Sequence, residues 1–325
     1  MATVDNPVVS VLMTAFNRER YVGPAIESVQ AQTFKEWELI VVDDCSTDST
    51  LEVARRYAAS DTRIRVYRNE HNLGDYRNRN HAASFARGEY IKYHDSDDIM
   101  YPHCLAIMHG LLAAEPKAQF ALSGSHSWVG APAPILLSPR QAYQREFLGP
   151  GDLFKWGPSC ALFRTTTFQA LGGFPDRGVV SDMALWFTAC ARFSLLLVPS
   201  DLFWYRVHAA QEFQKTGADR EHAAFQNLTF RRFHRDEVPL EAGEFELARQ
   251  RALWALVQSA WQDLRARRWS RFRLRTHGIS LLTLAKLLRR PLRNPLAGIG
   301  TDAEGAPRIP PWVRNQGVRA TELNK

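Results

Sequence analysis

Apolar runs, each followed by polar residues, recur along the first hundred residues of the chain. Four of them are short and rich in β-branched side chains, which predicts strands of a largely buried sheet: residues 8–16 (VVSVLMTAF), 37–44 (WELIVVDD), 64–69 (IRVYRN) and 90–94 (YIKYH). Helical patterns separate them and predict three helices: residues 18–33, 46–60 and 75–88. Ser49 and Glu52 fit a capping box, and we expect Gly88 to close the third helix.

Strands that alternate with helices in this way predict right-handed βαβ units, hence an α/β fold with a mostly parallel sheet. After residue 102 the pattern is more mixed. It predicts a helix, then strands and helices up to about residue 208, then a mostly helical segment. The ranges are 102–116 (helix), 160–193 (strand, helix, loop, helix), 195–208 (one or two strands) and 218–290 (mostly helical).

Composition narrows the class of protein but does not name a function. The 325 residues are 45% apolar and 23% charged, as is usual for a globular chain of one large or two modest domains. The four cysteines show no metal-ligand or redox spacing, so free thiols are expected. No signal-type pattern opens the chain, and no apolar run reaches the roughly 18 residues that span a bilayer. A cytoplasmic protein is therefore expected.

Polar side chains follow three of the predicted strands at the point where each strand ends: Asn17, Asp43, Asp44, Asp95 and Asp97. Ligands of open α/β sheets bind at this edge. The run HDSDD (94–98) read alone is typical of a solvated turn, whereas clustered carboxylates with an apolar strand before them suit Mg²⁺ or Mn²⁺. Neither a P-loop nor a G-x-G-x-x-G turn follows the first strand. Metal and side chains are therefore expected to hold the ligand.

Three blocks of sequence resemble family 2 glycosyltransferases, which have the nucleotide-sugar-binding GT-A fold. The blocks are VSVLMTAFNRERYVGPAIESVQAQTFKEWELIVVDDCSTDST (9–50), NLGDYRNRNHAASFARGEYIKYHDSDD (72–98) and LGGFPDRGVVSDMALW (171–186). They stand in the family's order, and the resemblance covers roughly residues 7–212. It implies a nucleoside diphosphate sugar donor and a Mn²⁺ or Mg²⁺ cofactor.

The resemblance also implies roles for individual residues on the donor side. Thr14, Phe16 and Asn17 match the loop that lies against the nucleoside. Asp44 matches the residue that hydrogen-bonds the base, usually uracil. Arg79 matches an arginine near the nucleotide, although an exposed helix arginine is an equal alternative from the sequence.

Asp95 and Asp97 match the family's Asp-x-Asp motif. The resemblance places Asp95 toward the ribose or a metal-bound water and Asp97 as a direct metal ligand. Asp98 is expected to help orient the other two. In the segment WYRVHAAQEF, His208 matches a metal or phosphate ligand, and Arg206 matches a residue that neutralises the diphosphate.

Asp182 matches the family's catalytic base. Two of its neighbours depart from the family pattern, because Ser181 replaces a glutamate and Ala184 replaces an aspartate. A helix N-cap before MALWF is the alternative role for Asp182.

The resemblance implies an inverting transfer from a nucleoside diphosphate sugar, with UDP favoured, to a hydroxyl of a saccharide or lipid-linked acceptor. Bacterial-type polysaccharide or glycolipid assembly is the expected setting. A sugar nucleotidyltransferase and a non-catalytic nucleotide-sugar-binding scaffold or sensor are alternatives. We expect a GT-A domain over residues 1–217, with a donor half (1–102) and an acceptor half (103–217). A basic helical region (218–293) and a poorly ordered tail (294–325) should follow.

Positive charge is concentrated in the C-terminal third of the chain. The net charge is +7, yet residues 231–325 contain 19 basic and nine acidic side chains. Residues 249–293 contain 12 basic side chains and a single acidic one, Asp263. Basic amphipathic helices with aromatic residues bind anionic membranes, so peripheral contact at the inner face of the membrane is one interpretation. A helical subdomain with an arginine-rich face is the other, and no nucleic-acid-binding module is recognised.

Overall fold

The computed structural model describes residues 6–124, 133–149, 151, 153–208, 211, 218–235, 238–280 and 283–285. The chain divides into two compact units. The first comprises Met1–Ser138 and Phe154–His208, and the second comprises Pro139–Leu153 and Ala209–Lys325. Residues 139–153 thus group with the C-terminal helices. The expected donor and acceptor halves stay predictions, and the predicted tail 294–325 lies outside the described residues.

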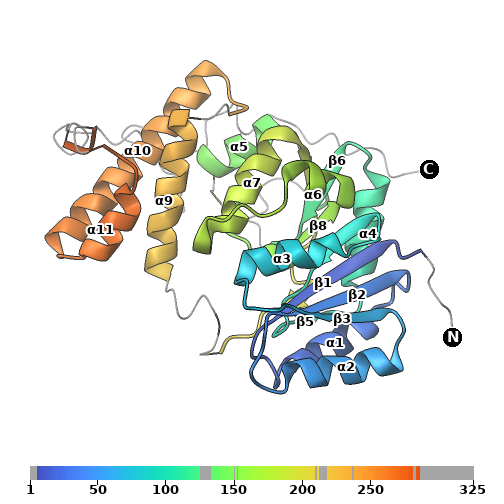
Figure 1. Ribbon diagram of the computed structural model, residues 1–325. Coiled ribbons are helices and arrows are strands. Elements are labelled where there is room, and N and C mark those ends of the chain that lie inside the picture. The colour runs from blue at the N-terminus through green and yellow to red at the C-terminus, as the bar shows by residue number, and fades with distance from the viewer. Residues whose placement is uncertain are drawn as a thin grey trace, which may run out of the picture. The chain divides into compact units, whose positions relative to one another are not determined.

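The first unit is built on a sheet of eight strands in the order β3-β2-β1-β4-β8-β6-β9-β7 (Figure 1). Its strands are β1 (Val9–Ala15), β2 (Trp37–Asp43), β3 (Ile64–Arg68), β4 (Tyr90–Tyr93), β6 (Ala118–Leu122), β7 (Ile135–Leu137), β8 (Ala161–Arg164) and β9 (Ser194–Leu197). The first four run parallel, and β6 and β9 are also parallel. β8 and β7 run antiparallel to their neighbours. The predicted α/β fold with a mostly parallel sheet is confirmed.

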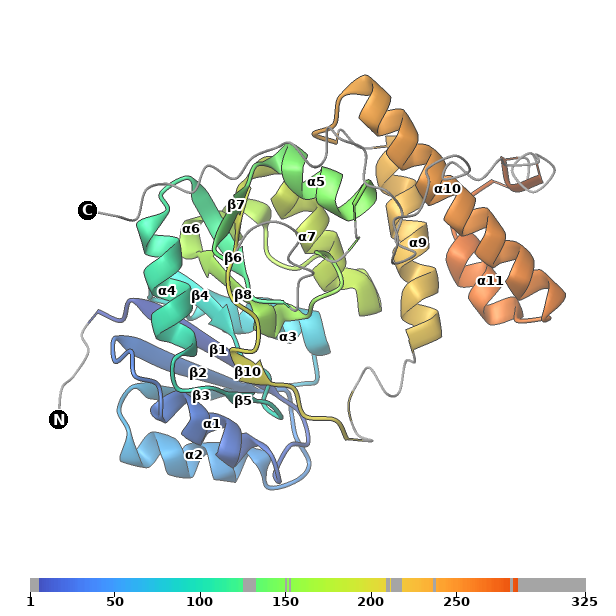
Figure 2. The ribbon, with the colours of Figure 1, turned by 180° about the vertical axis from the view of Figure 1, so that it is seen from behind.

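Helices cover both faces of the β1–β3 part of this sheet. The helices of the unit are α1 (Val22–Gln30), α2 (Thr50–Ser60), α3 (Asp75–Ser84), α4 (Cys104–Ala114), α6 (Thr165–Leu171) and α7 (Ser181–Arg192). α1 and α2 lie on one side and α3 lies on the other (Figures 1 and 2). β1 and β2 are buried along almost their whole length because their apolar side chains meet helices on both faces, whereas β3 at the edge of the sheet is mostly half-buried. A short antiparallel pair, β5 (Ile99–Met100) and β10 (Phe203–Trp204), links the segment after β4 to the end of the unit.

Two expectations about helix ends are wrong. Ser49 is the N-cap of α2, but its side chain makes no cap hydrogen bond; in the first turn the Thr50 amide donates to Asp48 Oδ1 at 3.0 Å. Gly88 does not close α3, which ends at Ser84. A Cβ on Gly88 would lie 2.7 Å from the Ser10 backbone nitrogen, so the glycine allows the chain to approach β1 closely.

The second unit is helical, as predicted for the described part of residues 218–290. It contains α5 (Pro139–Phe147), α9 (Ala218–Arg235), α10 (Ala242–Arg265) and α11 (Trp269–Thr276). Phe230 of α9 packs on Leu253, Leu256 and Val257 of α10. Asp263, the one acidic residue in the basic segment 249–293, is buried, and its Oδ2 accepts a hydrogen bond from Arg275 Nε at 3.0 Å. No helix in the described part of the chain has the length and apolar character needed to cross a bilayer.

Candidate functional site

The polar residues that follow β1, β2 and β4 meet at one edge of the sheet, as predicted. In the register of the parallel strands, Ala15 lies beside Asp43, and Leu12 lies beside Tyr93. The loop after β1, the residues after β2 and the run 94–98 therefore emerge at the same edge. This is the edge at which open α/β sheets bind ligands.

The loop after β1 is fixed to the loop after β2 by the Asn17 residue. Asn17 has a positive φ of 53°, its amide donates to Ser46 Oγ at 2.9 Å, and its Oδ1 accepts from the Thr47 amide at 2.9 Å. Thr14 is half-buried at the end of β1, and Phe16 is 41% exposed beside it. The loop is thus held rigid with an aromatic ring open to solvent. A nucleoside contact by these three residues stays a prediction.

Asp44 is buried and fastens the turn that precedes α3. Its Oδ1 accepts from the Leu73 amide at 2.8 Å and from Asn69 Nδ2 at 2.6 Å, and its Oδ2 accepts from the Gly74 amide at 2.9 Å. These bonds hold the carboxylate in one orientation, and a contact to the base would use its remaining lone pairs. Asp43 has a structural role, because its Oδ2 accepts from the Ser46 amide.

Arg79 is buried between two carboxylates, so the alternative of an exposed helix arginine is wrong. Its Nε lies 2.8 Å from Asp75 Oδ1, and its Nη2 lies 2.8 Å from Asp95 Oδ1. Burial would raise the pKa of Asp95, but the Arg79 guanidinium outweighs burial and lowers it. Asp95 is therefore an anion held in place by α3.

Asp97 is contacted from two distant segments of the chain. Arg18 Nε lies 3.0 Å from Asp97 Oδ2, and His208 Nε2 lies 2.9 Å from the same oxygen. Arg206 donates from Nε to the Asp97 carbonyl and from its amide to Asp98 Oδ1. The residues predicted for metal and diphosphate are thus together in space. Arg18 was not predicted, because nothing in the sequence links it to a partner 79 positions away.

The surroundings of Asp98 disfavour the charged form of its carboxyl group. Burial, followed by the charge of Asp95, raises the pKa of Asp98 to about 8. Its Oδ2 is buried and has no hydrogen-bond partner among the described residues. A divalent cation beside these carboxylates would relieve their mutual repulsion.

The donor set suits the Mn²⁺ or Mg²⁺ that the resemblance implies. No three His, Cys, Asp or Glu side chains in the described part of the chain form a complete metal site. Such ions commonly take one or two carboxylates and complete their shell with water and substrate phosphates. Asp97 is the first candidate ligand, with His208 Nε2 2.9 Å from its Oδ2, and a contact of Asp95 through water stays a prediction.

Asp182 lies in the first turn of α7, which begins at Ser181 and has Val180 as its N-cap. Its alternative role as the N-cap is therefore wrong. Burial, followed by the charges of Asp182 and Asp75, raises the pKa of the Tyr76 phenol, so Tyr76 lies near both of these acids. Ser181 Oγ donates to the Gly178 carbonyl and so bonds within its own turn.

The Cys160 thiol shows that Asp182 and the Asp-x-Asp run share one region. Burial raises the pKa of Cys160 to about 12, and the charges of Asp95, Asp182 and Asp98 add to this effect. Asp182 and the Asp-x-Asp run thus lie in the same part of the first unit. Tyr76 joins Arg18 as a residue that the sequence did not predict for the site.

The segment before β8 supports the Asp-x-Asp run from the other side. Ser159 Oγ accepts from the Asp95 amide at 3.1 Å. The buried Lys92 donates from Nζ to the Ser159 carbonyl and, at 2.9 Å, to the Tyr93 carbonyl. These two residues position the backbone of Asp95, and neither was predicted from the sequence.

Comparison with known proteins shows which family the chain resembles. Residues 10–170 match the family model described as glycosyl transferase family 2. EpsE of Bacillus subtilis, named as a glycosyltransferase, is 44% identical over 193 residues, covering 55% of this chain and 66% of EpsE. The chain therefore spans slightly less than two thirds of that relative.

Two solved structures are similar in fold. TarS of S. aureus in complex with UDP-GlcNAc has a TM-score of 0.59 at 19% identity, covering 86% of this chain and 79% of that chain. A mannosyltransferase of Pyrobaculum calidifontis in complex with GDP-Man and Mn²⁺ has a TM-score of 0.60 at 18% identity, covering 87% and 79%. The sheet, the family model and the sequence relatives agree, and through residues 10–170 the chain belongs to glycosyltransferase family 2.

Proposed function

We propose that the protein transfers a sugar from a nucleoside diphosphate sugar, with UDP favoured, to a hydroxyl of a saccharide or lipid-linked acceptor, with inversion at the anomeric carbon. Bacterial-type polysaccharide or glycolipid assembly in the cytoplasm is the proposed setting. The observation that carries the proposal is the meeting of Arg18 and His208 on the Asp97 carboxylate, at the sheet edge that also holds Asp95. The family match gives no support to the nucleotidyltransferase alternative.

On the donor side, the rigid loop with Thr14, Phe16 and Asn17 would face the nucleoside, with Asp44 toward the base. Arg79 keeps Asp95 ionised and oriented toward the ribose side. Arg206 would neutralise the diphosphate. In support of this role, its hydrogen bonds to the Asp97 carbonyl and the Asp98 carboxylate hold it beside the candidate metal ligands. The Mn²⁺ or Mg²⁺ ion, held by Asp97, His208 and indirectly by Asp95, would supply positive charge to the leaving diphosphate.

On the acceptor side, Asp182 would take the proton of the attacking hydroxyl. General-base catalysis of this kind contributes roughly 10²–10⁴-fold to the rate. An inverting transfer needs no enzyme nucleophile, because the hydroxyl attacks the anomeric carbon directly and the carbon–diphosphate bond breaks. Tyr76 lies beside Asp182 and would hold its backbone in position.

The donor assignment is tested by thermal unfolding with UDP, GDP and their sugars, with and without Mn²⁺. A ligand at one hundred times its Kd adds about 2.7 kcal/mol to the stability of the folded state. We expect UDP-sugars with Mn²⁺ to give the largest shift, and Asp97→Ala to lose the Mn²⁺-dependent part. A shift that is equal in Asp97→Ala would remove Asp97 from the metal site.

The base assignment is tested by Asp182→Asn, with Asp176→Asn as the matched control. Asp176 is a well-exposed carboxylate that pairs with Arg77 at the protein surface. We expect Asp182→Asn to lose transfer by at least the roughly 10²-fold of a general base while donor binding is kept. Normal turnover by Asp182→Asn would contradict the assignment, and donor binding without turnover in the unmodified protein would favour the scaffold alternative.

A further inference from the structure

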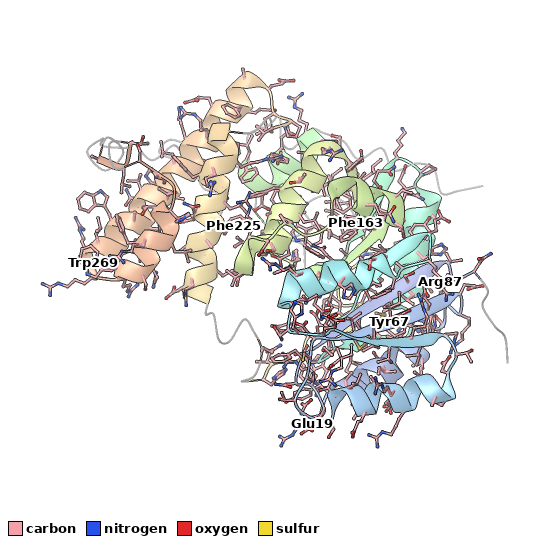
Figure 3. The ribbon with its side chains drawn as sticks, viewed as in Figure 1. Glu19, Tyr67, Arg87, Phe163, Phe225 and Trp269 are labelled. Atoms are coloured by element: carbon pink, nitrogen blue, oxygen red, sulfur yellow. The ribbon has the colours of Figure 1, made fainter. Side chains whose placement is uncertain are left out.

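A basic and aromatic surface lies where α10 ends and α11 begins, and we call it the α10–α11 corner. It consists of six exposed residues: Trp261, Arg265, Arg267, Arg268, Trp269 and Arg273. The two indoles are 41% and 56% exposed. Figure 3 shows Trp269 at the outer edge of the helical unit.

The arginines of this segment fall into two groups with different surroundings. Arg271 and Arg275 point inward, toward the buried Asp263 carboxylate. Arg271 Nε lies 3.2 Å from Asp263 Oδ1, and Arg275 Nε lies 3.0 Å from Asp263 Oδ2. They hold α11 against α10, and their charge is compensated. The arginines of the α10–α11 corner make no ion pair in the described part of the chain.

Among the described residues, no ion pair compensates the positive charge of the corner. No acidic side chain occurs from residue 264 to residue 285, and Asp263 is 1% exposed. Arginines near an anionic bilayer are attracted to it electrostatically, and tryptophan indoles insert at the boundary between headgroups and acyl chains. The corner presents both kinds of side chain on one surface.

We propose that the α10–α11 corner docks on the surface of an anionic lipid bilayer. Its arginines would contact headgroup phosphates, and Trp261 and Trp269 would enter the interface. A single-stranded nucleic acid, whose phosphates and bases could use the same side chains, is the competing occupant that the test below separates from a bilayer. The proposal goes beyond glycosyl transfer and does not depend on it.

The test is sedimentation of the full chain with vesicles of phosphatidylglycerol and phosphatidylcholine in equal parts, without donor or acceptor. One arginine near such a surface contributes about fivefold to binding, so Arg267→Gln/Arg268→Gln should weaken binding about 25-fold. The control Arg55→Gln/Arg56→Gln removes the same charge from the exposed side of α2 and should bind like the unmodified chain.

A second measurement reports the indoles directly. Lipids brominated on their acyl chains should quench part of the tryptophan fluorescence, and Trp261→Ser/Trp269→Ser should lose that quenching. Circular dichroism verifies that each variant is folded. Equal vesicle binding by the arginine variant and its control would overturn the proposal, as would the absence of binding to anionic vesicles. Tighter binding of single-stranded DNA that depends on the same arginines would also overturn it.

Discussion

Replacing Arg79 by methionine tests whether the candidate site is held together by a buried ion pair. The side chain of Arg79 is 9% exposed, between Asp75 and Asp95. Methionine keeps the length and most of the volume of the side chain but removes the guanidinium. The variant therefore leaves two carboxylates close together without their shared counter-ion.

The expected cost follows from the exposure of the two acids. Removing one partner of a fully buried pair costs about 3–5 kcal/mol. Asp75 and Asp95 are 39% and 24% exposed, so water screens part of their charge. We therefore expect Arg79→Met to lower the free energy of unfolding by about 2–3 kcal/mol at neutral pH. Arg77→Met is the matched control, since Arg77 and Asp176 are 69% and 63% exposed and such pairs contribute about 0–1 kcal/mol.

The cost should also depend on pH in a defined direction. Arg79 lowers the pKa of Asp95 in the folded protein against the effect of burial. The stabilisation is therefore present above the unfolded pKa of about 4 and is lost as the pH falls through the lower, folded pKa. The difference in stability between the unmodified protein and Arg79→Met should shrink as the solution is acidified.

Urea unfolding, monitored by hydrogen exchange of the backbone amides in β1 and β4, would measure the stability of the first unit alone. Adding Asp95→Asn to Arg79→Met should recover part of the lost stability, because it removes one of the unpaired charges. Equal stabilities of Arg79→Met and Arg77→Met, or a difference that does not change with pH, would refute the reasoning.

Three other variants and treatments give further predictions. Asp263→Asn should destabilise the helical unit by about 3 kcal/mol, because a buried guanidinium loses its counter-ion; a loss below 1 kcal/mol in urea unfolding would contradict this. The hydrogen bond from Arg63 lowers the pKa of Asp61 from 3.8 to about 2, so the stability that Arg63→Met removes should vanish as the pH falls from about 4 toward the folded value. Iodoacetamide at neutral pH should modify the half-exposed Cys45 before the buried Cys160, as mass spectrometry of the intact protein would show.

The first half of the fold was predictable because each strand carries its own apolar run. β1, β2, β3 and β4 fall within the four predicted ranges, and their parallel order follows from the intervening helices. The antiparallel direction of β8 was not predictable, since it depends on pairing with β4 about 70 residues earlier. The local pattern of apolar and polar residues predicts the type of an element and its buried face, but it does not predict which strand pairs with which.

The part of the candidate site that directly follows an apolar strand was predictable, whereas the residues that join it from distant parts of the chain were not. Asp95 and Asp97 follow a strand, and the direction of that strand places them at the binding edge. Arg18, Tyr76 and Lys92 meet their partners through the folded chain, so their sequence neighbours give no signal. The sequence left two roles open for Arg79, a residue near the nucleotide or an exposed helix arginine. The burial of its guanidinium excludes the exposed arginine.

The bond from Lys92 to Ser159 limits how this protein can be re-engineered. Ser159 is bonded at its carbonyl by Lys92 and at its hydroxyl by the Asp95 amide. A library that varies residues 158–160 to admit a new acceptor would therefore also move the residue proposed to contact the donor ribose. Directed evolution of acceptor preference should hold Ser159 and Lys92 constant, and lineages that change either one should show altered donor affinity as a correlated trait.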